Sequence, residues 1–76
     1  MTRDAVIETL RRVALPEGGN VVDADLLRAL TIEGETVRFL LEVDPARGRA
    51  LEPVRAAAQA AVAALPGVAT VSALLT

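Results

Sequence analysis

Apolar residues recur along the chain with spacings that predict two helices. In residues 3–14 they return every three or four positions, which places them on one face of a helix. Residues 51–65 show the same spacing and are rich in alanine, the residue with the highest helix propensity. Pro16 ends the first helix, and Pro53 is expected in the first turn of the second, where its missing N–H costs little.

Other segments alternate between apolar and polar residues, which is the period of a strand with one buried face. The predicted strands are residues 27–33, 36–43 and 68–75. Residues 36–43 alternate most clearly, whereas residues 26–30 are also compatible with a helix. Glu33-Gly34-Glu35 is a short link containing glycine, which is typical of a hairpin. Val21 and Val22 predict either a brief additional strand or a loop folded against the core.

The order helix, short strand, hairpin, helix, strand predicts a two-layer α+β fold. We expect two helices packed on one face of a three- to four-stranded mixed sheet. Because the last strand follows a crossover helix, it is expected to run parallel to the strand before that helix. A chain of 76 residues is one small domain at most, so residues 1–76 are expected to form a single domain.

The composition argues against several kinds of chemistry. The sequence has no Cys and no His, so it lacks thiolate ligands, a cysteine nucleophile and the most common general base. The net charge of −2 disfavours phosphate contacts, and no apolar run is long enough to span a bilayer. We therefore expect a non-catalytic cytoplasmic domain with no metal or cofactor of its own and with neither a nucleic-acid nor a membrane partner.

Two further features predict no specific chemistry. Gly18 and Gly19 lack the surrounding motif of a phosphate-binding loop, so they indicate a flexible turn. Carboxylates occur two residues apart at three places, but two such side chains are too few for a hard cation and are expected to be solvated. These pairs are Asp23 with Asp25, Glu33 with Glu35, and Glu42 with Asp44.

The stretch from Asp44 to Arg55 carries the charges of most interest. Arg47 and Arg49 precede the second helix, where positive charge opposes the helix dipole. Arginines beside the free N–H groups of a helix start predict a docking point for an anion or an acidic partner. The alternative is that Asp44 and Glu52 neutralise the arginines and the stretch is simply solvated. The candidate partner contacts are Asp44, Pro45, Arg47, Arg49, Glu52 and Arg55.

Three phrases occur in an order and spacing that are typical of one family. They are the turn Pro16-Glu17-Gly18-Gly19, the hairpin from Leu30 to Val43, and Ala64-Leu65-Pro66-Gly67-Val68 followed by Val71 and Leu75-Thr76. The chain resembles the small N-terminal domain of Mrp/ApbC-type iron–sulfur cluster carrier ATPases and its PaaD-like relatives. Many relatives have a Cys-containing phrase after the central strand, and the corresponding residues 44–53 keep the prolines without the Cys.

The resemblance implies a function for the parent protein. Such a parent binds ATP and a [4Fe–4S] cluster and delivers the cluster to acceptor proteins, and residues 1–76 would be its N-terminal accessory domain. The implied partners are the protein's own ATPase domain or iron–sulfur acceptor proteins. Two alternatives stay open: a stand-alone cluster-assembly adaptor of the PaaD-like kind, and a regulatory domain that binds a small molecule.

Overall fold

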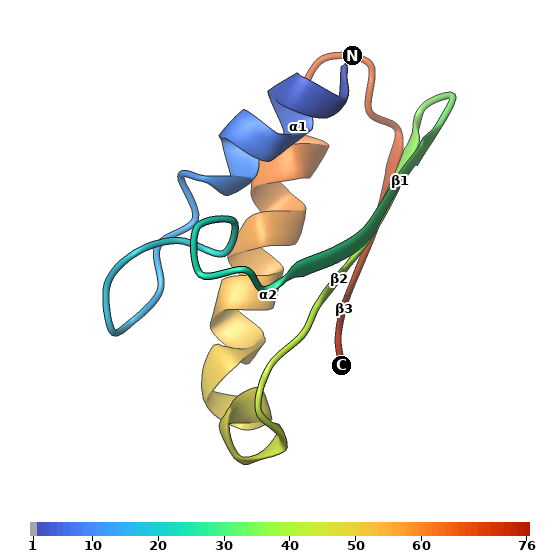
Figure 1. Ribbon diagram of the computed structural model, residues 1–76. Coiled ribbons are helices and arrows are strands. Elements are labelled where there is room, and N and C mark those ends of the chain that lie inside the picture. The colour runs from blue at the N-terminus through green and yellow to red at the C-terminus, as the bar shows by residue number, and fades with distance from the viewer. Residues whose placement is uncertain (1) are drawn as a thin grey trace.

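The computed structural model describes residues 2–76, and within them two α-helices lie on one side of a three-stranded sheet (Figure 1). The elements in chain order are α1 (Arg3–Leu10), β1 (Leu27–Glu33), β2 (Thr36–Leu41), the 3-10 helix η1 (Pro45–Arg47), α2 (Gly48–Ala63) and β3 (Thr70–Leu75). This arrangement confirms the predicted two-layer α+β fold.

The sheet has the strand order β1-β2-β3, with β2 in the centre. β1 and β2 are antiparallel and form the predicted hairpin, in which Gly34 has a φ of 59°. Glycine adopts this conformation without steric cost, and a positive φ at the first position of a two-residue turn matches the twist of the strands. β2 and β3 are parallel, with Thr36 opposite Thr70 and Leu41 opposite Leu75. The predicted parallel pairing is therefore confirmed.

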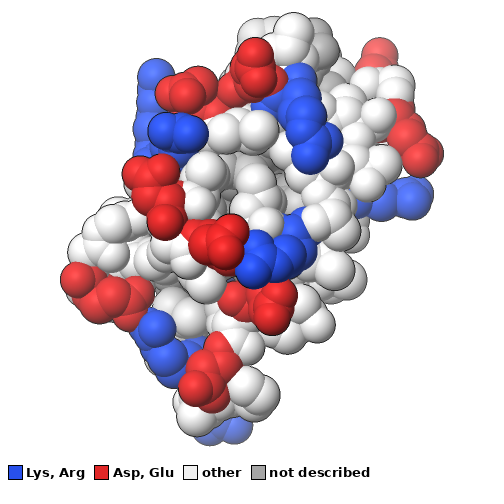
Figure 2. Space-filling view, in the orientation of Figure 1, with Lys and Arg blue, Asp and Glu red and all other residues white. Residues whose placement is uncertain are grey.

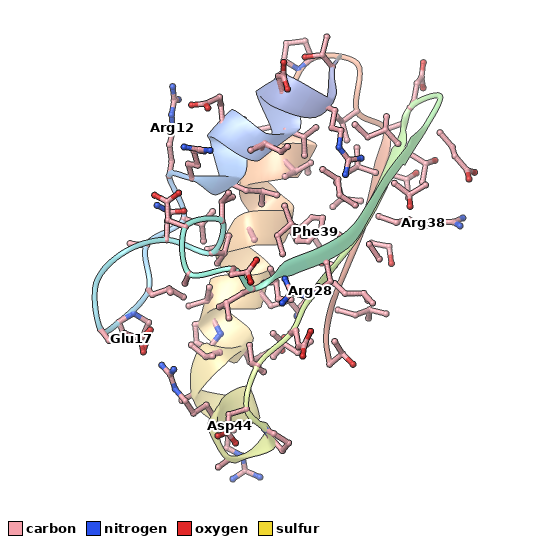
Figure 3. The ribbon with its side chains drawn as sticks, viewed as in Figure 1. Arg12, Glu17, Arg28, Arg38, Phe39 and Asp44 are labelled. Atoms are coloured by element: carbon pink, nitrogen blue, oxygen red, sulfur yellow. The ribbon has the colours of Figure 1, made fainter. Side chains whose placement is uncertain are left out.

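The core lies between the sheet and the two helices. Alternate residues of β2 point toward the helices, and Val37, Phe39 and Leu41 are each at most 1% exposed. Figure 3 shows Phe39 projecting from the sheet toward α2. The helices contribute the buried residues Val6, Leu10, Leu51, Val54, Ala58 and Val62. The apolar faces predicted for both helices therefore form the core.

A bulge in β1 explains the ambiguous sequence of that strand. The register with β2 shifts between Arg28 and Thr31, and Ala29 takes a φ of 53°. Leu27 and Leu30 are three positions apart, so a regular strand would turn them to opposite faces. The extra residue of the bulge places Leu30 in the core while Leu27 stays opposite buried Leu41.

The additional strand predicted at Val21 and Val22 is not formed, because residues 21–25 make a turn. The Asn20 side chain accepts hydrogen bonds from the N–H groups of Val22, at 3.0 Å, and Asp23, at 2.9 Å. An asparagine that bonds the backbone two residues ahead favours a turn over a strand. Val21 is nonetheless fully buried, so the alternative of a loop folded against the core is confirmed.

The ends of the elements differ from the predicted ends. α1 stops at Leu10 instead of residue 14, because the N–H groups of Arg12 and Val13 bond carbonyls three residues back and tighten the chain. α2 runs from Gly48 to residue 63 instead of 51–65. Pro53 is therefore its sixth residue and lies in the second turn, and the prediction of a first-turn position is wrong. β2 and β3 are each two residues shorter than predicted.

Candidate functional site

Asp44 and Pro45 set the local structure at the start of α2. The Asp44 carboxylate accepts a hydrogen bond from the N–H of Ala46 at 2.9 Å, and its carbonyl accepts one from the N–H of Arg47 at 2.8 Å. Pro45 occupies the beginning of η1, where the N–H group that proline lacks would have no partner within the helix. Asp44 therefore already accepts from the first N–H groups of this helical segment, one through its carboxylate and one through its backbone carbonyl.

Arg47 is held by an acid from a distant loop. Its guanidinium forms an ion pair with Glu17, which lies 30 positions earlier in the chain. Glu17 lies in a turn closed by hydrogen bonds from the N–H of Leu15 to the Gly19 carbonyl and from the N–H of Gly18 to the Leu15 carbonyl, both at 3.0 Å. This ion pair connects the loop after α1 to the start of α2. Both side chains are about half exposed, so solvent weakens the attraction.

Arg55 faces the sheet and forms a network there. Its Nη2 lies 2.6 Å from a carboxylate oxygen of Glu52, and its Nη1 donates to the Gln59 side chain at 2.7 Å. Nη1 also donates to the carbonyl of Ala73 in β3 at 3.1 Å. The hydrogen bond from Arg55, aided by its charge, lowers the pKa of Glu52 below the ordinary 4.5, although desolvation opposes this. Arg55 thus fastens α2 to β3.

The structure therefore divides the six predicted contact residues into two groups. Asp44, Pro45, Arg47 and Arg49 lie at the start of α2, whereas the Glu52–Arg55 pair is directed toward β3. Arg49 is exposed, and no ion pair involves it among residues 2–76. We name the exposed end formed by residues 44–49 the α2 start surface. Figure 2 shows acids and arginines interspersed on one face of the molecule, without a large area of one charge.

Three structural features are absent from residues 2–76. Between residues 2 and 76 there is no cluster of three or more Asp, Glu, His or Cys side chains arranged to hold a metal ion. The same residues form no detectable pocket. None of the helices in this part of the chain has the length and apolar character that a membrane span requires.

Comparison with known proteins identifies the family. A family model described as "Iron-sulfur cluster assembly protein" matches residues 3–73, which is nearly the whole chain. The chain belongs to this iron–sulfur cluster assembly family. The family match confirms the cluster-assembly part of the predicted resemblance. No curated protein matches the sequence significantly.

A solved structure shares the fold of this cluster assembly domain. It is the crystal structure of a "Domain of Unknown Function DUF59" from Bacillus anthracis, with a TM-score of 0.66 and 19% sequence identity. The match covers 96% of this chain and 72% of that chain. At this identity the likeness supports the arrangement of helices and sheet alone.

Sequence patterns do not reveal two long-range contacts, one of which positions the candidate site. The spacing around Glu17 indicates a turn and gives no sign that Glu17 meets Arg47 at the start of α2. Arg3 joins α1 to β1, because its Nη1 donates to the Leu30 carbonyl at the bulge, at 2.9 Å. Both contacts join residues about 30 positions apart, and single-sequence patterns report only neighbours along the chain.

Proposed function

We propose that this chain is a non-catalytic accessory domain of a Mrp-like, ATP-binding iron–sulfur cluster carrier. In this role it docks a protein partner during cluster assembly or transfer. The observation that carries the proposal is family membership combined with the side-chain inventory, because the sequence contains neither Cys nor His. Protein-bound clusters are held by Cys thiolates, with His as a replacement in some centres. The cluster is therefore cargo held by the carrier or the acceptor, and this domain contributes a surface.

The α2 start surface is the contact region that we propose. Arg49 places an exposed positive charge at one end of the molecule, near exposed Pro45 and near Arg47, which is paired with Glu17. Arginine donates in a fixed geometry that suits carboxylates, so the fitting partner surface is acidic. The Glu52–Arg55 pair supports this surface indirectly, because Arg55 holds α2 against β3.

Cluster transfer tests the proposed docking. A P-loop carrier loaded with a [4Fe–4S] cluster is mixed with an apo-acceptor, and the rate at which the cluster appears in the acceptor is measured with and without this chain. Calorimetry measures binding of the chain to the carrier and to the acceptor. We expect binding to one of them and a changed transfer rate. If the chain binds to neither protein and leaves the transfer rate unchanged at every concentration, the proposal is contradicted.

Charge reversal tests the surface. Arg49→Glu removes an exposed cation that forms no ion pair with any of residues 2–76, so the fold is expected to be unaffected while binding weakens. Arg38→Glu is the matched control, because Arg38 is exposed on the face of the sheet that points away from the helices (Figure 3). Equal effects of the two variants would reject the α2 start surface and leave the family function intact.

Reconstitution tests the proposed absence of cluster ligation. The purified chain is incubated with ferrous iron, sulfide and a thiol reductant and then desalted. We expect no visible absorbance and no retained iron. A stoichiometric cluster on the chain would contradict an accessory role without ligands.

A stand-alone adaptor remains the second candidate, because the matching family model names cluster assembly without naming an ATPase. The two functions differ in the polypeptide that contains this chain. A phosphate-binding G-K-G-G-[VI]-G-K-[ST] phrase in the same polypeptide supports the carrier, and its absence from the complete reading frame supports the adaptor.

A further inference from the structure

The two outer edges of the sheet differ in how their backbone groups are covered. An edge strand exposes unpaired N–H and C=O groups, and proteins commonly block such edges with bulges, charges or covering groups. The β1 edge has all three. It contains the bulge after Arg28, the charged residue Glu33, and the hydrogen bond from Arg3 to the Leu30 carbonyl at 2.9 Å. The bulge and the charge within the strand, which β3 does not share, obstruct the pairing of a further strand along this edge.

The β3 edge lacks the first two devices. Residues 70–75 include no charged residue, no proline and no register shift. The N–H groups of Thr70 and Thr76 donate to carbonyls on the β2 side. The backbone N–H and C=O groups of successive residues point to alternate sides of a strand. Even-numbered residues of β3 direct these groups toward β2, so odd-numbered residues between Thr70 and Thr76 direct them outward. These outward residues are Val71, Ala73 and Leu75.

Arg55 covers one of the outward groups only in part. Its Nη1 donates to the Ala73 carbonyl at 3.1 Å, and its side chain is 24% exposed. A carbonyl oxygen has two lone pairs, so Ala73 can accept a second donor while Arg55 stays in place. The pairing of Arg55 with Glu52 at 2.6 Å also balances the charge beside the edge. Arg55 therefore does not obstruct this edge as the bulge obstructs the β1 edge.

Leu74 is the large apolar side chain that residues 2–76 leave most exposed, at 57%. It lies on the sheet face opposite the helices, beside half-buried Leu40 in the register of β2 and β3. A strand added outside β3 would place a cross-strand neighbour against Leu74 and remove apolar surface from water.

We infer that the outer edge of β3 pairs with the same edge of a second copy of this chain. The two β3 strands run antiparallel across a two-fold axis and join two three-stranded sheets into one of six strands. The second copy is the fitting occupant because the strand is uncharged along its whole length. Pairing it with itself opposes no like charges and matches outward N–H groups with outward C=O groups.

The symmetry restricts the register. In both strands the residues that direct their backbone groups outward have odd residue numbers. The residue numbers of any two residues that lie opposite each other therefore add to an even sum. One residue therefore faces its own copy at the axis, and for a well-overlapped pair this residue is Ser72, Ala73 or Leu74. Directly opposite residues of antiparallel strands lie about 4.5–5.5 Å apart at Cα, within the range of a disulfide.

Sedimentation equilibrium with single variants is the first test. We expect the 76-residue chain to form a dimer between micromolar and near-millimolar concentration. Leu74→Lys should raise the dissociation constant at least about tenfold, because it puts a charged side chain where the added strand covers apolar surface. Ala56→Lys adds the same charge to the exposed face of α2 and should leave the constant unchanged. A monomer at every concentration, or equal effects of the two variants, would overturn the inference.

Cross-linking is the second test, and the absence of native cysteine makes each introduced thiol unambiguous. Ser72→Cys tests a two-fold axis at Ser72, and Leu74→Cys tests an axis at Leu74. An equimolar mixture of the two variants tests an axis at Ala73, which places residue 72 of one copy opposite residue 74 of the other. Under mild oxidation one of the three samples should form a disulfide-linked dimer much faster than Thr31→Cys on β1. Cross-linking no faster than that control, or a dimer that links through Thr31→Cys, would reject β3 as the paired edge.

Discussion

Phe39 gives the sharpest test of the packing. It is the single aromatic residue of the chain, it lies on the central strand β2, and it is 1% exposed. Phe39→Ala removes the largest fully buried side chain without changing the charge or the backbone donors of the strand. The expected result is a large loss of unfolding free energy.

The magnitude follows from the buried area. An aromatic side chain buries about 150–250 Å², which at about 25 cal/mol per Å² corresponds to about 4–6 kcal/mol. Alanine retains its β-carbon, and the unfolded chain already buries some of this area, so the expected loss is about 3–4 kcal/mol. A 76-residue domain has about 4–11 kcal/mol in total. Phe39→Leu keeps most of the volume and should cost about 1 kcal/mol.

Urea unfolding followed by far-ultraviolet circular dichroism measures these losses, because the chain has no Trp or Tyr for fluorescence. Arg38→Ala is the control, since truncating this exposed side chain on the face of the same strand away from the helices should change stability by less than about 0.5 kcal/mol. If Phe39→Ala fails to fold, the Phe39→Leu variant still gives a measurable loss to compare with the control. A Phe39→Leu loss no greater than that of Arg38→Ala would refute the assignment of Phe39 to the centre of the core.

Three further variants test local features. Gly34→Ala should lose about 1 kcal/mol in urea unfolding, because alanine is strained at a φ of 59°. Ala29→Val should lose about 1–3 kcal/mol, because a β-branched residue fits poorly at a φ of 53°, whereas Glu33→Val at an exposed position of the same strand should change stability by less than about 0.5 kcal/mol. Glu52 has a lowered pKa when folded, so its contribution is present above pH 4.5 and is lost as the pH falls through the folded pKa. Glu52→Gln should therefore make stability less dependent on pH in this range, and an unchanged pH profile would count against the Arg55 pairing.

The layers of this fold can be predicted from the sequence because each layer depends on local periodicity. The alternation in β2 and the three-to-four spacing in α2 are properties of neighbouring residues, and both produce the expected buried faces. β1 is harder, because a bulge converts the alternation of a strand into a spacing of three between Leu27 and Leu30. That spacing is also the spacing of a helix, so the sequence alone leaves residues 26–30 ambiguous.

The candidate site is harder to predict because its parts come from distant segments. Arg47 finds its acid in Glu17, across 30 positions, instead of in nearby Asp44, whose carboxylate is engaged by the backbone. The exposure of Arg49 agrees with the sequence, but its use as a partner contact stays a prediction.

The position of Arg55 shows how the face of a helix on which a side chain lies decides which charges act together. A helix beginning at residue 51 would place Arg55 in its opening turns, among the loop arginines. Because α2 begins at Gly48, Arg55 is its eighth residue, and Glu52 and Gln59 flank it three and four positions away on the same face. That face meets β3, so Arg55 binds the edge of the sheet instead of extending the α2 start surface. The face of α2 that Arg55 occupies therefore separates it from Arg47 and Arg49, and Arg55 fastens the helix to the sheet.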